Sequence, residues 1–386
     1  MLLKNASVVN DDFRVVSADI RTDGDRIVQI GALQSDPGET VLDLSGCYVL
    51  PGLIDTHIHG AFNEGIDCSD ADGLLRMAVF EATQGVTSFA ITSAAPDGFD
   101  AVLEQMRIGA EAARRSQQGE VKGSKIVAIH AEGPFLSQRR SGAMDPNRFL
   151  SPTPERLDAM MEAADGYLKL LTVAPENEGA YEFIQYAVSR GLTVSLGHSV
   201  ATYDEALAGM EAGATQVTHT FNGMPSYHHR EPGILGAALL SEKVKCEMIC
   251  DYVHLHPATV QLIYRLKGVD KVNMISDSVN LAGSDQTELD FDGVKAYIQD
   301  GVIRRADGTI ARSAMTLLNG VQNLLRDGYP VGDVAKMAAY NGAKTLGIDQ
   351  QTGSIAPGKL ADLMILDSNF RLLYTFVNGK CVYKAE

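Results

Sequence analysis

Three features that would indicate other kinds of protein are missing from this sequence of 386 residues. Its five cysteines are odd in number, scattered and without a Cys-x-x-Cys pair, so we expect free thiols rather than a disulfide framework. No apolar run approaches the roughly 18 residues of a membrane span. The first 30 residues mix charged and apolar side chains, unlike a signal peptide. We therefore expect a cytoplasmic protein with no membrane partner.

Positive charge is also scarce. The chain has 33 lysines and arginines against 49 aspartates and glutamates, which gives a formal net charge of -16. So acidic a chain is a poor partner for nucleic acid or for an anionic membrane surface. A small anionic ligand remains compatible, because a few local cations can hold it.

Two histidines follow an apolar run and a Pro-Gly pair in the segment Val49-Leu50-Pro51-Gly52-Leu53-Ile54-Asp55-Thr56-His57-Ile58-His59-Gly60. Side chains at positions i and i+2 of a strand share a face, so we expect His57 and His59 to point the same way. Two adjacent imidazoles form a metal-ligand pair. The apolar approach favours a buried strand over a surface loop, and we predict that both histidines bind metal.

The middle of the chain alternates apolar runs with helical stretches, the pattern of βα units around a parallel sheet. Eight runs are predicted as strands: Val49–Thr56, Val86–Thr92, Lys125–His130, Leu168–Val173, Leu192–Leu196, Thr215–Thr218, Lys245–Cys250 and Val272–Ile275. Eight such strands predict an α/β fold with a TIM-like (β/α)₈ barrel over residues 49–345.

The two ends of the chain differ from this middle. Residues 1–48 and 346–386 are rich in short β segments with Asp-Gly and Asn-Gly turns, which predicts one small β-sandwich domain built from both termini. Residues 281–310 interrupt the barrel pattern with acidic, glycine-containing short strands. We predict a β-hairpin insertion there, either a lid over the barrel mouth or a passive surface excursion.

The residues that follow the predicted strands form a set of potential ligands. They are His57 and His59, Thr92 and Ser93, Glu132, Glu176, His198, His219, Asp251 and Asp277. Active sites of such barrels lie at the carboxyl ends of the strands, so we expect these side chains to meet there.

Glu132, His198 and His219 make a common divalent-metal set that leaves a coordination position for water. We favour Zn²⁺, with Fe²⁺ or another first-row ion as the alternative. If His57 and His59 join the set and Glu132 bridges, the site has enough ligands for two ions rather than one.

Asp277 ends the eighth strand. A carboxylate beside a metal-activated water can accept its proton during attack and later protonate the leaving group. We predict that Asp277 acts as base and then as acid, with a role as a plain metal ligand as the alternative.

Residues 218–233 hold the densest set of side chains that can contact a ligand. Asn222-Gly223 offers a turn whose backbone N–H groups can face an anion, and the Arg230 guanidinium suits phosphate or carboxylate. His254, after the seventh strand, adds a donor. These residues predict a site for an anionic substrate group, with a solvated loop as the alternative.

Several motifs resemble the amidohydrolase superfamily. Residues 51–60 are similar to its first-strand signature, and residues 340–343 and 353–362 are similar to its closing segment. Within the superfamily the chain resembles the N-acetylglucosamine-6-phosphate deacetylases. The motifs that carry this resemblance are His130-Ala131-Glu132-Gly133-Pro134-Phe135-Leu136, Ala174-Pro175-Glu176, Gly197-His198-Ser199, Thr218–Met224 and Arg230–Gly233.

The resemblance implies metal-dependent hydrolysis of the acetamide of N-acetylglucosamine 6-phosphate, which gives glucosamine 6-phosphate and acetate. It assigns the principal metal to Glu132, His198 and His219, and acid/base catalysis to Asp277. Some members lack the His-x-His pair and bind one ion, whereas this chain keeps His57 and His59, so the resemblance is compatible with one or two ions per subunit.

The resemblance also implies a sugar-phosphate site. Asn222, Gly223, Arg230 and His254 match positions that contact the sugar phosphate. In the family the Arg and His come from the neighbouring subunit, so a homodimer is implied, with Arg230 and His254 near the partner's site.

The chain departs from the family pattern beside the expected sugar. The family has a Lys-Gly-Ala-His-like run whose His touches the sugar, and here Ala143 and Met144 stand at its end. The thioether of Met144 cannot replace that hydrogen bond. Tyr252 stands where Gly is usual, and Arg312 where a small residue is common. Alternatives are therefore another N-acetylhexosamine phosphate, an N-acyl-D-amino acid, or a non-catalytic sugar-phosphate-binding barrel.

Overall fold

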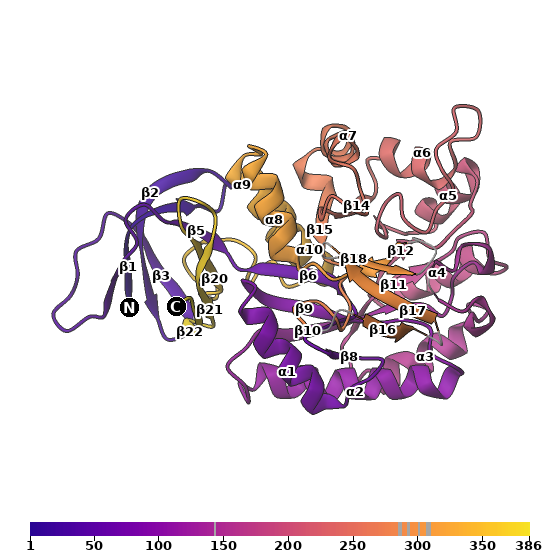
Figure 1. Ribbon diagram of the computed structural model, residues 1–386, viewed down its shortest axis with the longest axis horizontal. Coiled ribbons are helices and arrows are strands. Elements are labelled where there is room, and N and C mark those ends of the chain that lie inside the picture. The colour runs from indigo at the N-terminus through magenta and orange to yellow at the C-terminus, as the bar shows by residue number, and fades with distance from the viewer. Residues whose placement is uncertain (143, 285–287, 292–293, 300–301, 306–309) are drawn as a thin grey trace.

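The computed structural model describes residues 1–386 except residues 143, 285–287, 292–293, 300–301 and 306–309. A barrel and a smaller sheet lie side by side, and both chain ends lie in the smaller sheet (Figure 1). Within the residues described, no helix is long and apolar enough to cross a membrane.

Eight parallel strands form the barrel, in the order β15-β14-β13-β12-β11-β10-β9-β6. They are β6 (Leu53–Ile58), β9 (Val86–Ser93), β10 (Lys125–Glu132), β11 (Leu168–Val173), β12 (Thr193–Leu196), β13 (Gln216–Val217), β14 (Lys245–Ile249) and β15 (Val272–Ile275). Two backbone bonds join the first and last strands just past their ends: Asp277 N–H donates to His57 O and His59 N–H donates to Ser278 O, both at 2.9 Å. The predicted (β/α)₈ barrel is confirmed.

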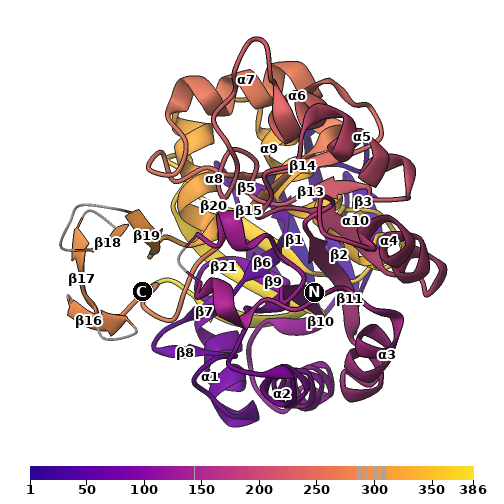
Figure 2. The ribbon, with the colours of Figure 1, turned by 90° about the vertical axis from the view of Figure 1, so that its right-hand side faces the viewer.

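Helices cover the outside of the barrel (Figure 2). They are α1 (Ala71–Ala82), α2 (Phe99–Gln117), α3 (Pro154–Ala163), α4 (Ala180–Ser189), α5 (Tyr203–Glu211), α6 (Gly233–Leu240), α7 (Pro257–Lys267), α8 (Leu317–Arg326), α9 (Val331–Ala335) and α10 (Asn341–Leu346). Side-chain caps fix where several of them begin, because Asp70, Thr153 and Thr202 accept hydrogen bonds from the free N–H groups of the first turn.

Strands from both chain ends form a second sheet in the order β22-β21-β20-β5-β1-β2-β3, with β4 beside β1. They are β1 (Leu2–Val9), β2 (Val15–Asp23), β3 (Arg26–Gly31), β4 (Val41–Asp43), β5 (Tyr48–Pro51), β20 (Leu363–Leu366), β21 (Leu372–Val377) and β22 (Lys380–Lys384). A separate apolar cluster that includes Val8, Ile20, Val49 and Phe376 forms its core. The predicted small β domain of both termini is confirmed.

The predicted first barrel strand, residues 49–56, is two strands. β5 pairs with β1 and β20 in the terminal sheet, and β6 begins the barrel after Gly52. A Cβ atom at Gly52 would lie 2.1 Å from Cγ2 of Thr87. Only glycine therefore fits where the chain passes from the sheet into the barrel.

The insertion after β15 is a four-stranded antiparallel sheet rather than one hairpin. Its strands are β16 (Glu288–Phe291), β17 (Val294–Gln299), β18 (Val302–Arg305) and β19 (Ile310–Ser313). Figure 2 shows this sheet at the side of the barrel. Ile303 packs with Val279 and Leu281, which directly follow β15, so the insertion is anchored at the barrel rim.

A buried ion pair joins the barrel to the terminal segments. Lys125, the first residue of β10, places its Nζ 2.7 Å from Oδ2 of Asp362, and both side chains are almost fully buried. Asp362 also accepts hydrogen bonds from Thr352 Oγ1 and from the Asn378 N–H, both at 2.8 Å.

Removing one partner of this pair should be costly, since it leaves a buried charge without its counterion. We expect Lys125→Met to lower the free energy of unfolding by about 3 kcal/mol, measured by urea denaturation. Lys243→Met is the matched control, because Lys243 pairs with Glu211 at 2.6 Å on the exposed surface. It should change the same quantity by less than about 1 kcal/mol. If both variants lowered the free energy of unfolding equally, the buried pair would not be what stabilises the contact between the barrel and the terminal segments.

Candidate metal centre

The predicted metal ligands come together at the carboxyl ends of the barrel strands, the end that faces the viewer in Figure 2. Glu132 is the last residue of β10, and His198, His219 and Asp277 each follow their strand by two residues. These last three have positive φ angles of 45°, 25° and 50°. Residues other than glycine rarely adopt this left-handed backbone, and it is concentrated at functional sites.

Glu132 lies at the centre of the cluster. Its Oε1 atom is 2.9 Å from Nε2 of His219, 3.2 Å from Nε2 of His198 and 3.4 Å from Nε2 of His57. Its Oε2 atom is 3.2 Å from Nε2 of His59. One carboxylate therefore reaches all four imidazoles, so Glu132 could contribute an oxygen to either pair of histidines.

Asp277 lies beside the His57 and His59 pair. Its Oδ1 atom lies 3.5 Å from Nε2 of His57 and 3.4 Å from Nε2 of His59. Its side chain is 20% exposed, whereas those of the two histidines are at most 5% exposed. Asp277 is thus the member of this group most open to a molecule that enters the barrel mouth.

The four histidine rings share one orientation, in which the Nδ1 atom of each faces an oxygen acceptor. The acceptors are Glu247 Oε2 for His57 (3.0 Å), Thr92 O for His59 (3.1 Å), Arg140 O for His198 (2.8 Å) and Asn222 O for His219 (3.1 Å). Carbonyl and carboxylate oxygens only accept, so the hydrogen must be on Nδ1. Every neutral ring then presents the lone pair of Nε2 to the cluster.

These lone pairs face one another at short range. The Nε2 atoms of His57 and His59 are 3.3 Å apart, and those of His198 and His219 are 3.0 Å apart. With the carboxylates of Glu132 and Asp277 beside them, the atoms that converge here are all acceptors. Divalent first-row cations bind this combination of imidazole nitrogen and carboxylate oxygen, so the donor set fits a divalent metal.

Without a metal, protons must take the place of the cation. Burial lowers the pKa of His57, but the charges of Glu132, Asp277 and Glu247 outweigh it and raise the pKa well above its ordinary value. Burial likewise raises the pKa of Glu132, but His57 and His198 hold it well below its ordinary value. Metal must therefore displace protons from the cluster, and its affinity is expected to fall as the pH is lowered.

Sequence reasoning missed Glu247, which lies on β14 and is fully buried. Besides facing His57, its carboxylate accepts hydrogen bonds from the side-chain amide of Gln216 and from the backbone N–H of His219. The sequence does contain a signal for this role, because Glu247 is a single carboxylate inside the apolar run of residues 245–250. A buried charge is rarely tolerated without a partner, so its position indicates a bonded carboxylate.

Asn222 and Gly223 lie against the ligand histidines. The Nδ2 atom of Asn222 is buried and has no hydrogen-bond partner among the residues described, so it is a donor available to a bound molecule. A Cβ atom at Gly223 would lie 3.1 Å from Nδ1 of His198 and 3.2 Å from Cε1 of His219. Together with a φ of +61°, this spacing explains why glycine occupies the position.

The two predicted phosphate ligands differ in their surroundings. Arg230 is exposed, and its guanidinium contacts His229 on the loop that precedes α6. His254 is nearly buried, and its Nδ1 lies 2.7 Å from Asp251. Burial lowers the pKa of His254, but the bonded Asp251 and the charge of Asp277 raise it above the ordinary value. His254 is therefore an enclosed ring bonded to a carboxylate, whereas Arg230 is an exposed cation.

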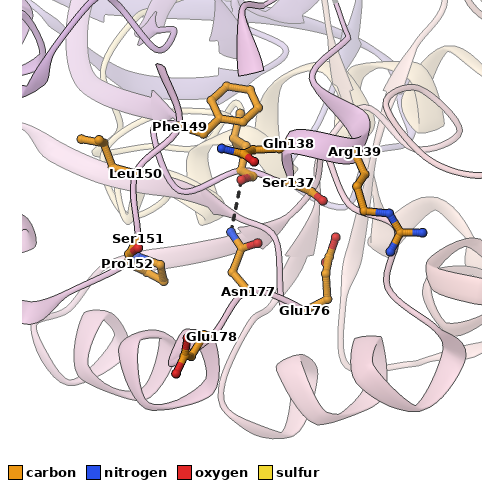
Figure 3. Close-up of a pocket in the computed structure, with 11 residues that line it drawn as sticks. Ser137, Gln138, Arg139, Phe149, Leu150, Ser151, Pro152, Glu176, Asn177 and Glu178 are labelled. Atoms are coloured by element: carbon orange, nitrogen blue, oxygen red, sulfur yellow. Dashed lines mark hydrogen bonds between the residues drawn. The ribbon is translucent and has the colours of Figure 1, made fainter. Parts of the chain in front are cut away.

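One departure from the family pattern, Met144, lies beside a separate pocket of about 390 Å³ (Figure 3). Ser137, Arg139, Phe149, Glu176 and Asn177 are among the residues that line it, and the predicted metal ligands are not. Met144 packs against the apolar cluster that contains Phe149, so its thioether contributes to this neighbouring core. Ala143 lies outside the described residues.

Comparisons with known proteins agree with this architecture. The model of the amidohydrolase family matches residues 48–382. The N-acetylglucosamine-6-phosphate deacetylase of Vibrio furnissii is 34% identical over 92% of this chain and 89% of its own length. The N-acetylgalactosamine-6-phosphate deacetylase of Escherichia coli O157:H7 is 32% identical over 86% of each chain.

A solved structure is similar to this chain over the whole fold. An aspartate-to-alanine variant of the N-acetyl-D-glucosamine-6-phosphate deacetylase from Mycobacterium smegmatis, in complex with N-acetyl-D-glucosamine-6-phosphate, has a TM-score of 0.89 to this chain. It is 29% identical, with 99% of each chain covered. The chain belongs to the N-acetylglucosamine-6-phosphate deacetylase family of the amidohydrolase superfamily.

Proposed function

We propose that this protein hydrolyses the acetamide of N-acetylglucosamine 6-phosphate to glucosamine 6-phosphate and acetate, and that the reaction depends on a divalent metal. The observation that carries the proposal is the convergence of four Nε2 lone pairs and two carboxylates at the barrel mouth. The relatives named above supply the substrate class.

Glu132, His198 and His219 would hold the principal ion, and His57, His59 and Asp277 surround the second position. We favour Zn²⁺, with Fe²⁺ as the alternative, because imidazole and carboxylate ligands suit both. Such an ion would polarise the acetamide carbonyl and lower the pKa of water.

Asp277 would carry the proton through the reaction. As the water oxygen attacks the carbonyl carbon, the carboxylate of Asp277 takes the proton that the water loses. When the carbon–nitrogen bond breaks, Asp277 returns this proton to the departing amine nitrogen. Its exposure at the mouth, greater than that of the neighbouring histidines, supports this role.

Asn222, Gly223, Arg230 and His254 would bind the sugar phosphate. The unpartnered amide of Asn222 and the raised pKa of His254 support binding of a phosphate at the mouth. Arg230 is exposed on the loop that precedes α6, which supports a homodimer in which it reaches the partner's site. The overall charge of -16 makes such local cations necessary for an anionic substrate.

N-Acetylgalactosamine 6-phosphate is the second candidate substrate. A relative named for that sugar is 32% identical, close to the 34% of a relative named for the glucose epimer. Met144 also stands where the family places a histidine against the sugar.

Acetate release from a series of sugars tests the activity. Metal-loaded protein should release acetate from N-acetylglucosamine 6-phosphate, and the metal-free protein should regain turnover only when metal is returned. The unphosphorylated sugar should have a kcat/KM roughly 10- to 100-fold lower, because charge-assisted hydrogen bonds are worth about 1.5–3 kcal/mol. A higher kcat/KM for N-acetylgalactosamine 6-phosphate would select the second candidate. If the metal-loaded protein released no acetate from either phosphorylated sugar, the deacetylase assignment would be refuted.

The variant Asp277→Asn tests the proton carrier. The amide keeps the size of the side chain but cannot accept the proton, so we expect kcat to fall by about 10²- to 10⁴-fold. Metal content, measured by elemental analysis, should remain as in the wild type. Loss of one ion together with activity would show that Asp277 is a ligand instead.

Mixed oligomers test whether Arg230 acts in the partner's site. Arg230→Ala and Asp277→Asn chains are each expected to be nearly inactive. In a mixture of the two, hybrid dimers would contain one site with an intact Asp277 and an intact Arg230 from the other subunit. Activity should then recover to about a quarter of the wild-type value with random pairing. An absence of recovery would place Arg230 in its own subunit's site.

A further inference from the structure

We propose that Glu247 is a positioning residue that fixes the tautomer of His57 and thereby controls whether the second metal position fills. Glu247 differs from the other three groups that face the ligand imidazoles, because they are neutral backbone carbonyls and it is a carboxylate. The inference rests on the metal dependence proposed above.

The carboxylate of Glu247 is itself fixed by three N–H donors. Its Oε2 atom lies 3.0 Å from Nδ1 of His57 and 3.1 Å from the backbone N of His219. Its Oε1 atom lies 2.7 Å from Nε2 of Gln216. The side chain is completely buried. A buried carboxylate is stable only when its oxygens are satisfied in this way.

The orientation of Gln216 is determined from the opposite side. Thr345 donates its hydroxyl to Oε1 of Gln216 at 3.0 Å, and Lys245 Nζ approaches the Thr345 oxygen at 2.6 Å. With its oxygen engaged there, Gln216 must turn its amide nitrogen to Glu247. A buried polar chain therefore runs through the barrel from Lys245, at the start of β14, to His57.

This chain has a direct effect on one ligand. Because Oε2 of Glu247 only accepts, it retains the hydrogen of His57 on Nδ1 and leaves the lone pair on Nε2, the atom 3.3 Å from Nε2 of His59. A carboxylate behind a ligating imidazole also raises its basicity, and loss of such a partner typically weakens metal binding by about 10- to 100-fold. The effect should fall on the metal position that His57 and His59 form.

Counting metal in Glu247→Gln tests the inference without any substrate. Metal-free protein is titrated with Zn²⁺ against a chromophoric chelator, and the ions per chain are measured by elemental analysis. The wild type should bind two ions. Glu247→Gln should bind the first with unchanged affinity and the second about 10- to 100-fold more weakly.

A matched control separates this role from the general loss of a buried carboxylate. Glu81 on α1 is also buried, and its Oε1 atom has no hydrogen-bond partner among the residues described. Glu81→Gln should leave both ions bound as in the wild type. If Glu247→Gln does not fold, Gln216→Met, which removes only one of the three donors, should weaken the second ion in the same direction.

Three results would overturn the inference. They are a wild type that binds a single ion, equal weakening of both ions in Glu247→Gln, and a second ion that is as tight in the variants as in the wild type. Because the readout is metal content, it separates this inference from the proposed activity. A protein with two ions and the expected variant behaviour that releases no acetate would contradict the deacetylase proposal alone.

Discussion

The fixed direction of four imidazoles is the constraint on which this molecule depends. Each ring gives its Nδ1 hydrogen to an oxygen and aims Nε2 at a common point beside Glu132. A group of converging acceptors is unfavourable in a protein interior unless protons or a metal occupy it. The barrel imposes this arrangement, because the carboxyl ends of three different strands, β6, β12 and β13, carry the four rings.

The two groups of candidate metal ligands are built differently. The Nδ1 atom of His219 bonds to a carbonyl of its own loop, and that of His198 bonds to a carbonyl of a neighbouring loop. The conformation of these loops therefore sets this half of the site. His57 depends instead on a side chain of another strand, which a single substitution can alter. We expect the surroundings of His57 to vary more readily among related chains than those of His198 and His219, because replacing the Glu247 side chain requires no change of the backbone.

The sequence predicts the barrel well because its physical signals are local. Apolar runs mark the strands, side-chain caps mark where several helices begin, and polar residues just past the strands indicate the site. It fails where the signal is not local. The helix α6 is apolar throughout, so no amphipathic pattern identifies it. The break at Gly52 depends on the distant Thr87, and the role of Glu247 depends on a histidine 190 positions earlier. Side-chain partners across strands cannot be deduced from spacing alone.

The terminal sheet has a consequence for how the chain is made. β5 lies between β1, which precedes it in the chain, and β20, which begins at residue 363. During synthesis, β5 therefore has an unpaired edge until nearly the whole barrel has been translated. The same strand leads into β6, so the barrel must begin to form beside an unfinished sheet. β20 can therefore pair with β5 only after the barrel strands have been translated, and a chain cut short before residue 363 would leave this edge of β5 unpaired.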